Sequence, residues 1–360
     1  MASNCTVLNS SYPCNLTTIS PFANTTTAAS STATALTDKN KIRIAIYVIS
    51  IVLSWIGNSL VIMVSVMNRE SLSPCRILMA HLAVANLLFS IRLPFQIRLE
   101  MNGSKWEWGL FYCKVMHGFN SASLLASIET VAVIAIERYR GISKPYSSKW
   151  TKKHIIISII IVWAISLITY SPYMYYLNLN GTSCFDTYPS ITMQQTYSIV
   201  IFVMRYVIPV GILSFCYFKI GMVIHRRPTR VSTHQNQATE QNRKRENRRV
   251  IRILIVIVVA FALLTAPTSV WWLWYDFGGS DTKTALDMIE VFAALLYLHS
   301  AINPIIYGIM DQKFKKGVRD LFALCLGTPR LEVDSIAMEN RTRMDTVNKR
   351  TVTFTANGEK

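Results

Sequence analysis

The chain has 360 residues, of which 51% are hydrophobic and only 16% are charged. A soluble chain of ordinary composition carries about 25% charged residues, so we expect much of this surface to face lipid. The formal net charge of +17 suggests a nucleic acid or a membrane surface as partner. The basic residues fall in short runs between apolar stretches, and no nucleic-acid-binding motif occurs, so the pattern excludes nucleic acid and favours a membrane protein.

The N-terminal residues 1–41 are rich in Ser, Thr and Asn and contain no apolar core of a cleaved signal peptide. Their composition predicts an extracellular, glycosylated and disordered segment. The glycosylation acceptor pattern N-x-S/T also occurs in two short loops further along the chain, which indicates that these loops are extracellular too. The predicted glycosylation sites are Asn4, Asn9, Asn15, Asn24, Asn102 and Asn180.

Residues 42–310 contain seven long apolar stretches, each near the ~20 residues that a helix needs to cross a bilayer. Several contain proline, which a helix in a bundle tolerates because neighbouring helices satisfy the freed carbonyls. The sequence therefore predicts an all-α membrane protein, a bundle of seven transmembrane helices. The predicted spans are 42–67, 77–99, 110–139, 154–177, 195–225, 248–275 and 284–310.

The loops between these spans alternate in charge. The loops after residue 139 and at 226–249 are rich in Lys and Arg, whereas the other interhelical loops are poor in both. Because basic loops stay in the cytoplasm, the alternation predicts a multi-pass plasma-membrane protein with an extracellular N-terminus and a cytoplasmic C-terminus.

Two further segments follow the seventh span. Residues 311–326 alternate apolar and basic side chains at helical spacing, which predicts a short amphipathic helix on the membrane surface. Cys325 at its end is a candidate for palmitoylation, or equally an unmodified buried thiol. The polar residues 327–360 are expected to form a disordered cytoplasmic tail.

Short motifs occur in a fixed order along residues 42–325. The second span contains L-A-V-A-N at 82–86, the third ends in E-R-Y at 137–139, and the seventh ends in N-P-I-I-Y at 303–307. Jointly, at this spacing, the motifs resemble those of the rhodopsin-like (class A) G-protein-coupled receptors. The L-P-F and W-E-W-G sequences at 93–95 and 106–109 are frequent in peptide and nucleotide receptors of this family, and the resemblance is strongest to the peptide-receptor branch.

The resemblance implies a signalling role without catalysis or a cofactor. Arg138 would pair with Glu137 at rest and meet a heterotrimeric G protein after the sixth helix moves outward. Arrestin, receptor kinases and membrane lipids are the other implied partners. A disulfide between Cys113 and Cys184 would hold a loop over the ligand site. The implied coupling and activation residues are Glu137, Arg138, Tyr139, Tyr217, Phe261, Pro267, Asn303, Pro304 and Tyr307.

The sequence departs from the family in its polar core. Asn86 stands where the family usually has Asp, and Thr265 replaces the usual Trp two residues before Pro267. Without the carboxylate the family's sodium site loses its main anionic ligand, so we expect no metal site and little sodium modulation. The polar core is expected to consist of Asn86 with a hydrogen-bonded network of Asn58, Ser127, Ser300 and Asn303 around it.

The third span also limits the ligand. Asn120 lies eighteen residues before Arg138, a whole number of helical turns, so both should face the bundle interior together with Leu124. Aminergic relatives have Asp at the place of Asn120, which disfavours an amine ligand here. Opsins have a retinal-binding Lys at the place of Tyr297, which excludes a Schiff base.

Arg205 in the fifth span has two interpretations. A buried pair with Glu129 would resolve the desolvation of both charges. Alternatively, Arg205 faces the ligand site and holds an anionic group of the ligand; the resemblance favours this slightly, because the corresponding turn faces inward in the family. An ionisable residue at membrane depth is functional or paired in either case.

The outer ends of the spans combine both charges with aromatic residues, which suits a short peptide because many contacts share its binding energy. The tryptophans could instead belong to a membrane-interface belt. A receptor for an anionic lipid or a nucleotide is the main alternative, and a transporter is a remote one. Besides Asn120, Leu124, Arg205 and Tyr297, the predicted ligand-binding residues are Arg92, Gln96, Asp186, Trp271, Asp287 and Glu290.

Overall fold

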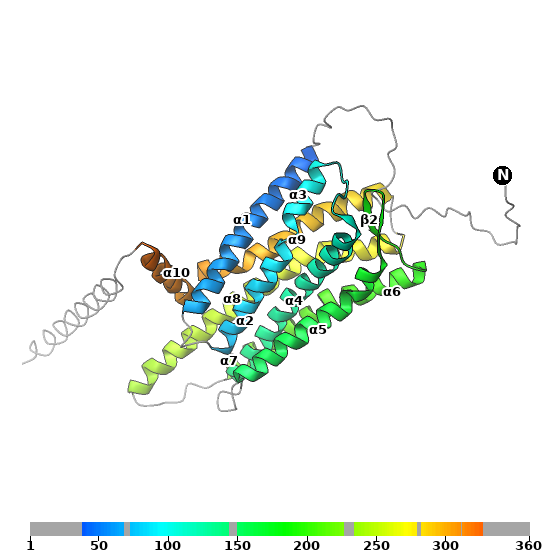
Figure 1. Cartoon of the computed structure of the whole chain (residues 1–360). Helices are drawn as coiled ribbons and strands as arrows, with labels where there is room; N and C mark the ends of the chain where they lie inside the picture. Colours follow the sequence, from blue (N-terminus) through cyan, green and yellow to red (C-terminus); the bar gives the residue numbers. More distant parts are fainter. Residues whose placement is uncertain are drawn as a thin grey trace, which may run out of the picture.

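The computed structural model describes residues 38–67, 73–143, 150–226, 234–278, 282–310 and 312–326. It does not describe the side chains of 224–226, 234–250, 253–254, 282–287, 307, 310 and 312–313. In the described ranges the protein is a bundle of long helices that run side by side (Figure 1). The predicted tail 327–360 and residues 1–37 of the predicted N-terminal segment lie outside the described residues, and residues 38–41 are helical.

The first two predicted spans form three helices. Helix α1 covers Asp38–Met67, α2 covers Pro74–Ser90 and α3 covers Leu93–Met101. The second span is interrupted between α2 and α3, just before Pro94. Proline lacks an N–H donor and favours the first turn of a helix, which explains why a new helix begins there.

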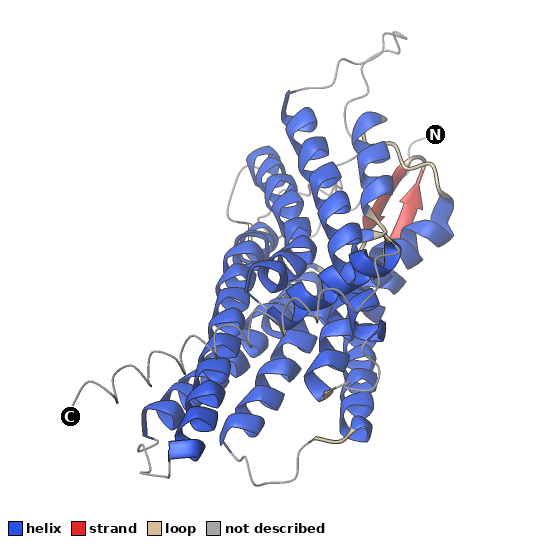
Figure 2. Ribbon diagram, turned by 90° about the vertical axis from the view of Figure 1, so that its left-hand side faces the viewer, coloured by secondary structure: helices blue, strands red, loops and turns tan. Residues whose placement is uncertain are grey.

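The third and fourth spans are α4 (Gly109–Ser143) and α5 (Lys152–Tyr176). The chain then forms a hairpin of two antiparallel strands, β1 (Leu177–Asn180) and β2 (Ser183–Asp186), that the sequence did not predict. Gly181 in the turn has φ 58°, which glycine adopts without strain. Figure 2 shows this hairpin in red at one end of the bundle. We call this the hairpin end.

The fifth span consists of α6 (Ile191–Phe202), the π-helical turn η2 (Val203–Val207) and α7 (Ile208–Arg226). The π-turn ends just before Pro209. A π-turn inserts an extra residue into the helix and changes the direction of the side chains around it; such turns occur often at functional sites.

The sixth and seventh spans are α8 (His234–Asp276) and α9 (Thr282–Met310). Helix α8 begins at His234, well before the predicted start at 248, because its polar first part is also helical. The short helix α10 (Gln312–Cys325) follows at the opposite end of the bundle from the hairpin (Figure 1), in agreement with the predicted amphipathic helix.

The bundle buries polar side chains and exposes apolar ones. Within the described residues, seven helices are long and apolar enough to cross a membrane. Helix α5 buries Ile155, Val162, Ser166 and Tyr170, which share one face, and exposes large residues such as Ile168 on the rest of its surface. An apolar surface of this extent fits a hydrocarbon environment.

The centre of the bundle is built around α4. Its residues Leu124 and Ile128 pack into one core cluster with Leu82 of α2 and Phe261 of α8. Asn120, Ser123 and Ser127 are also buried on α4. The interior therefore places polar groups from several helices within reach of one another.

Candidate functional site

A hydrogen-bonded network joins four helices in the middle of the bundle. Asn58 of α1 donates from Nδ2 to the Ser300 carbonyl of α9 at 2.9 Å. Asn86 of α2 donates to Asn58 Oδ1 at 3.5 Å and accepts from Ser127 Oγ of α4 at 2.7 Å. All four residues are buried. The structure thus brings the predicted polar core together.

Asn303, also expected in this network, lies one turn from Ser300 on α9 but makes no hydrogen bond within it, so the prediction was wrong for this residue. Both polar atoms of its side chain, and both ring nitrogens of His299, are buried without a partner among the described residues. His299 packs edge-on against Phe261, with ring centroids 5.7 Å apart. Thr265 donates from its hydroxyl to the Phe261 carbonyl at 2.8 Å, so it stays within its own helix.

At the end opposite the hairpin, Arg138 and Glu137 lie close together near the end of α4. Arg138 Nε is 3.1 Å from Glu137 Oε2. Tyr139 meets Phe215 of α7 at a ring-centroid distance of 6.1 Å. The buried hydroxyl of Tyr217 on α7 has no partner among the described residues. A charge pair and a hydroxyl with unused hydrogen-bonding capacity thus lie at this end.

The remaining predicted activation residues are prolines and one tyrosine. Pro267 lies inside α8 and Pro304 inside α9, where each removes a backbone hydrogen bond. The side chain of Tyr307 lies outside what the structure describes.

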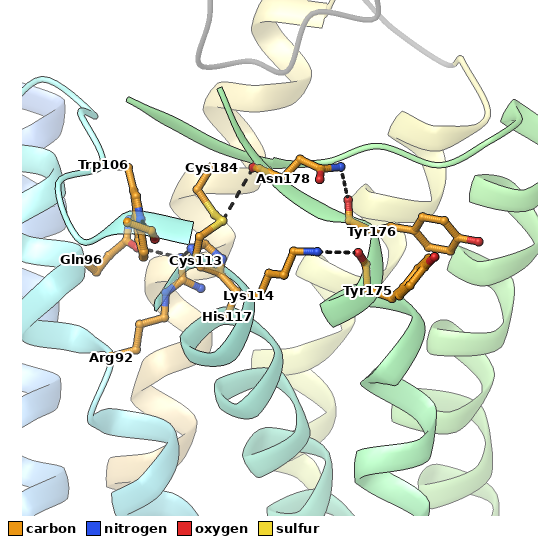
Figure 3. The surroundings of a disulfide bond; sticks show 11 residues. Arg92, Gln96, Trp106, Cys113, Lys114, His117, Tyr175, Tyr176, Asn178 and Cys184 are labelled. Carbon is orange, nitrogen blue, oxygen red and sulfur yellow. Dashed lines mark hydrogen bonds between the residues drawn. A yellow bond between two sulfur atoms is a disulfide. The ribbon is translucent and has the colours of Figure 1, made fainter. Parts of the chain in front are cut away.

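The hairpin is covalently attached to α4. Cys113 and Cys184 form the predicted disulfide, which joins the first turns of α4 to strand β2 (Figure 3). Trp106 packs in the same small cluster as Cys113 and Leu177. The backbone N–H of Trp106 also donates to the Thr182 carbonyl in the hairpin turn, at 2.7 Å. The hairpin is therefore fixed over this end of α4.

Beneath the hairpin, Arg92 contacts two polar side chains (Figure 3). Its Nη2 atom lies 3.1 Å from Gln96 Oε1 and 3.5 Å from His117 Nε2. These contacts link α4 to the break between α2 and α3. Arg92 and Gln96 thus lie together, as expected for two residues of one site, and His117 joins them.

Three predicted ligand-binding residues lie deeper, in contacts between helices. Asn120 donates from its amide to the Phe89 carbonyl of α2, and Leu124 belongs to the main core cluster. Tyr297 of α9 is buried, stacks on Phe89 at 4.7 Å and meets Tyr47 edge-on at 5.7 Å between ring centroids. These residues pack α4 and α9 against α1 and α2.

Glu290 lies in an ion cluster that the sequence did not predict. Arg43 of α1, only 8% exposed, contacts Glu290 of α9 through Nη1. Its Nη2 atom is 2.7 Å from Glu100 Oε2 of α3. Arg43 therefore bridges three helices near the hairpin end. A charged residue within an apolar first span was the signal in the sequence, because such a charge is seldom unpaired.

The remaining predicted ligand-binding residues near this end are Trp271, Asp287 and Asp186. Trp271 meets Trp274 at 4.7 Å and Phe292 of α9 at 5.8 Å, so it packs between α8 and α9. The Asp287 side chain lies outside what the structure describes. Asp186 in β2 lies within electrostatic reach of Asp276, a residue that the sequence analysis did not select.

Asp276 ends α8 and connects it to α6. Its carboxylate accepts hydrogen bonds from Gln194 at 2.8 Å and from Ser198. Surrounding protein atoms and the charge of Asp276 raise the pKa of Asp186 above its ordinary value, although the Asp186 side chain reaches solvent. Two carboxylates therefore lie near each other at the hairpin end.

The proposed Glu129–Arg205 pair does not form. Glu129 instead lies 3.5 Å from the Ser166 hydroxyl of α5, and no acidic residue of the described part of the chain forms an ion pair with Arg205. Tyr170 of α5 hydrogen-bonds with Arg205 and lies within electrostatic reach of Glu129. The pairing alternative was therefore wrong, because Glu129 contacts Ser166 and Arg205 contacts Tyr170.

A half-buried histidine that the sequence did not single out also connects several helices. His81 of α2 accepts from Trp163 Nε1 of α5 at 2.9 Å, and its other ring nitrogen lies 3.0 Å from the Thr130 hydroxyl of α4. The Trp163 N–H requires an acceptor, so His81 is the neutral tautomer that carries its proton on Nδ1. One imidazole thus joins three helices.

The predicted modification sites are partly described. Asn180 is exposed in the hairpin, whereas Asn102 at the end of α3 donates to Glu107 Oε1 at 2.6 Å. Cys325 at the end of α10 is a free, exposed thiol, so the alternative of a buried thiol is wrong. Asn4, Asn9, Asn15 and Asn24 lie outside the described residues.

Comparison with known proteins agrees with this architecture. Residues 57–307 match the family model described as "7 transmembrane receptor (rhodopsin family)". The mouse galanin receptor type 1 is 29% identical over 86% of this chain and 88% of its own length. The rat neuropeptide FF receptor 1 is 26% identical over 79% and 71%, and the mouse neuropeptide Y receptor type 6 is 28% identical over 81% and 83%.

Proposed function

This chain belongs to the rhodopsin family of seven-transmembrane receptors, and on that premise we propose that it is a cell-surface receptor for a short peptide, signalling through a heterotrimeric G protein. Members of this family are signalling receptors of the plasma membrane and not enzymes, so the chain catalyses no reaction. The observation that carries the peptide proposal is that the relatives are named for galanin, neuropeptide FF and neuropeptide Y.

The hairpin end is the extracellular end in this proposal. The disulfide between Cys113 and Cys184 supports this orientation, since such bonds persist on the oxidising side of a membrane. The exposed acceptor site at Asn180 lies on the same end. The basic loops after residue 139 and at 226–249 then face the cytoplasm, as the distribution of Lys and Arg requires.

The proposed ligand contacts the hairpin end and the helix ends around it. Arg92 with Gln96, Asp186, and Trp271 packed against Phe292 of α9 provide charged and aromatic groups there. A peptide can engage such separated groups simultaneously, with aromatic and arginine contacts contributing most of the affinity. Asp186, which is exposed at this end, suits a peptide that carries a basic residue.

Activation follows from linkage between the two ends of the bundle. A peptide that binds better when α8 has moved outward raises the population of that state, and a G protein that prefers the same state raises the peptide's affinity equally. In this proposal Arg138 leaves Glu137 and contacts the G protein. Tyr217 and Tyr307 supply hydroxyls, and Phe261 and Pro267 transmit the movement of α8.

The cytoplasmic part completes the proposed function. Helix α10 would lie on the inner leaflet, where palmitoylation of the exposed Cys325 adds an anchor. Ser and Thr residues of the tail 327–360 would accept phosphate from receptor kinases and thereby recruit arrestin.

The test is expression of the full chain in cells with sensors for each G-protein class, challenged with a neuropeptide collection. We expect one peptide to give a concentration-dependent response that Arg138→Ala abolishes at matched surface level. Arg140→Ala, which removes a neighbouring charge that contacts Trp150, is the control and should retain most of the response.

Two results would count against the proposal. If no peptide is active although the receptor reaches the surface, and an anionic lipid or a nucleotide is active, the ligand class changes while the receptor function stands. If Arg138→Ala signals as well as the wild type, the proposed role of Arg138 is wrong.

A further inference from the structure

Arg205 occupies an unusual place in the fifth span. It lies at the centre of the π-turn η2, which separates α6 from α7 and contacts both α4 and α8. A π-turn changes the direction of its side chains relative to a regular helix. The turn therefore presents an arginine toward the interior at membrane depth, where an ionised side chain is costly unless it has a partner.

The unused hydrogen-bond donors of Arg205 have a specific geometry. Its Nε and Nη2 atoms are both buried and have no hydrogen-bond partner among the described residues. These two nitrogens form one edge of the planar guanidinium group, with two parallel N–H bonds. This edge matches the two oxygens of a carboxylate, which it binds in a bidentate manner.

Polar side chains of two other helices lie near Arg205 and do not supply a negative charge that would pair with it. His299 of α9 is 1% exposed, has no partner at either ring nitrogen among the described residues, and interacts electrostatically with Arg205. Tyr170 of α5 also contacts Arg205. The nearby Glu129 bonds to Ser166 instead. Leaving several buried groups without hydrogen-bond partners is unfavourable, because each has lost its hydrogen bonds to water.

We propose that Arg205, with His299 and Tyr170, forms a carboxylate-binding site in the receptor core. Its occupant is a carboxylate of the activating ligand: the free C-terminus or an acidic side chain of a peptide, or the head of a fatty acid. This inference rests on the proposed function for the ligand, although the site itself is defined by this chain alone.

The burial of the site gives it a role in signalling. The Nε and Nη2 atoms are closed off from solvent, so a carboxylate reaches them only when the helices around η2 separate. A ligand that binds there stabilises the separated arrangement because it has higher affinity for that state. The site thereby links ligand chemistry to the helices that carry Phe261 and Asn303.

The first experiment measures carboxylate dependence in cells. The peptide collection is synthesised with free and with amidated C-termini, and each active peptide is remade with one Asp→Asn or Glu→Gln change at a time. Laurate and its methyl ester form the lipid arm. We expect the loss of one carboxylate to reduce potency on the wild type on the order of 30-fold or more, as for a buried charge pair.

Receptor variants identify the group that receives the carboxylate. Arg205→Gln should reduce the potency of the parent ligand by a similar factor. On the same variant, the carboxylate-free ligand should lose less than about threefold in potency relative to the wild type. A double-mutant cycle of receptor and ligand changes detects this coupling. Arg205→Lys keeps the positive charge but lacks the two parallel N–H bonds. The potency of the parent ligand on this variant should therefore lie between its potencies on the wild type and on Arg205→Gln. Equal losses for both ligands on Arg205→Gln would overturn the proposal.

Two control variants separate this site from other effects. Lys219→Gln removes a positive charge from the same span about 21 Å further along the helix, at 1.5 Å per residue, and should leave the carboxylate dependence unchanged. Glu129→Gln should also leave it unchanged. If Glu129→Gln abolishes the carboxylate dependence, the effect of Arg205 requires Glu129 rather than direct contact with the ligand, and the proposal is wrong.

A ligand-independent measurement keeps the inference testable if no peptide activates the receptor. The purified full chain in lipid nanodiscs is unfolded thermally in sodium benzoate and in sodium chloride of equal ionic strength. Benzoate should raise the midpoint of the wild type and of Lys219→Gln, but not that of Arg205→Gln. Equal midpoints in both salts for the wild type would overturn the carboxylate site, whereas a benzoate effect without peptide activity would overturn only the peptide proposal.

Discussion

Gly57 of α1 lies so close to Pro304 of α9 that a Cβ atom added at Gly57 would be only 2.6 Å from Pro304 Cβ. The missing side chain lets the two helices approach. The next residue, Asn58, can then donate to the Ser300 carbonyl on α9 at 2.9 Å. The small residue and the polar network are thus two parts of one helix contact, as in many membrane bundles.

We expect Gly57→Ala to destabilise the receptor by about 1–3 kcal/mol, because the new methyl group overpacks the contact with Pro304. Thermal unfolding of the purified protein measures the loss. Gly211→Ala is the matched control, since nothing lies within 4 Å of the Cβ position there, and alanine favours a helix by up to about 1 kcal/mol. Equal unfolding midpoints for Gly57→Ala and wild type would contradict the argument.

The variant Asn86→Asp should create sensitivity to sodium that the wild type lacks. Asn86 accepts a hydrogen bond from Ser127 at 2.7 Å and donates one to Asn58. An Asp carboxylate at this position, together with the Ser127 hydroxyl and the Asn58 amide oxygen, could therefore coordinate a cation. The measurement is the thermal midpoint in sodium chloride and in choline chloride of equal concentration. Asn86→Ser is the control without charge. A sodium-dependent shift in the wild type would refute our expectation for this core.

Removing Arg43 should cost about 3–5 kcal/mol of stability, because a buried Glu100 carboxylate loses its partner. Arg43→Met tests this by thermal unfolding, and the double variant Arg43→Met/Glu100→Gln should lose less than the sum of the two single changes. Lys41→Met is the control on the same helix. It breaks only an exposed pair with Asp38 and should cost less than about 1 kcal/mol. Strict additivity would show that the two charges do not interact.

The carboxyl group of Asp186 should give the protein a measurable pH dependence. Surrounding protein and Asp276 raise its pKa in the folded state, so the folded protein binds more protons than the unfolded chain. Stability is therefore lost as the pH rises from about 3.9, the pKa of an unfolded Asp, through the raised value. Compared with Asp186→Asn, the wild type should gain in unfolding midpoint as the pH falls from about 7 to about 4. Parallel midpoints over this range would exclude the effect.

The sequence alone determined the number and approximate limits of the spans, and its motifs indicated the receptor family and, through that resemblance, the disulfide. These features depend on local properties: about twenty apolar residues cross a bilayer whatever their neighbours are, and short motifs keep their spacing along a helix. Helical phase also placed Asn120, Leu124 and Ser127 correctly inside the bundle. The breaks were less predictable, because Pro94 begins a helix whereas Pro172 lies within one.

Only the tertiary structure decided which polar groups become partners. Arg43 joins Glu100 and Glu290, which lie 57 and 247 residues away in the chain, and Asp276 joins Gln194 and Ser198. No periodicity in the sequence reports such pairs, because each depends on how two helices are rotated and spaced. The same applies to Arg205, whose direction depends on a π-turn. Its unsatisfied donors became visible only once Tyr170, Glu129 and His299 were placed around it.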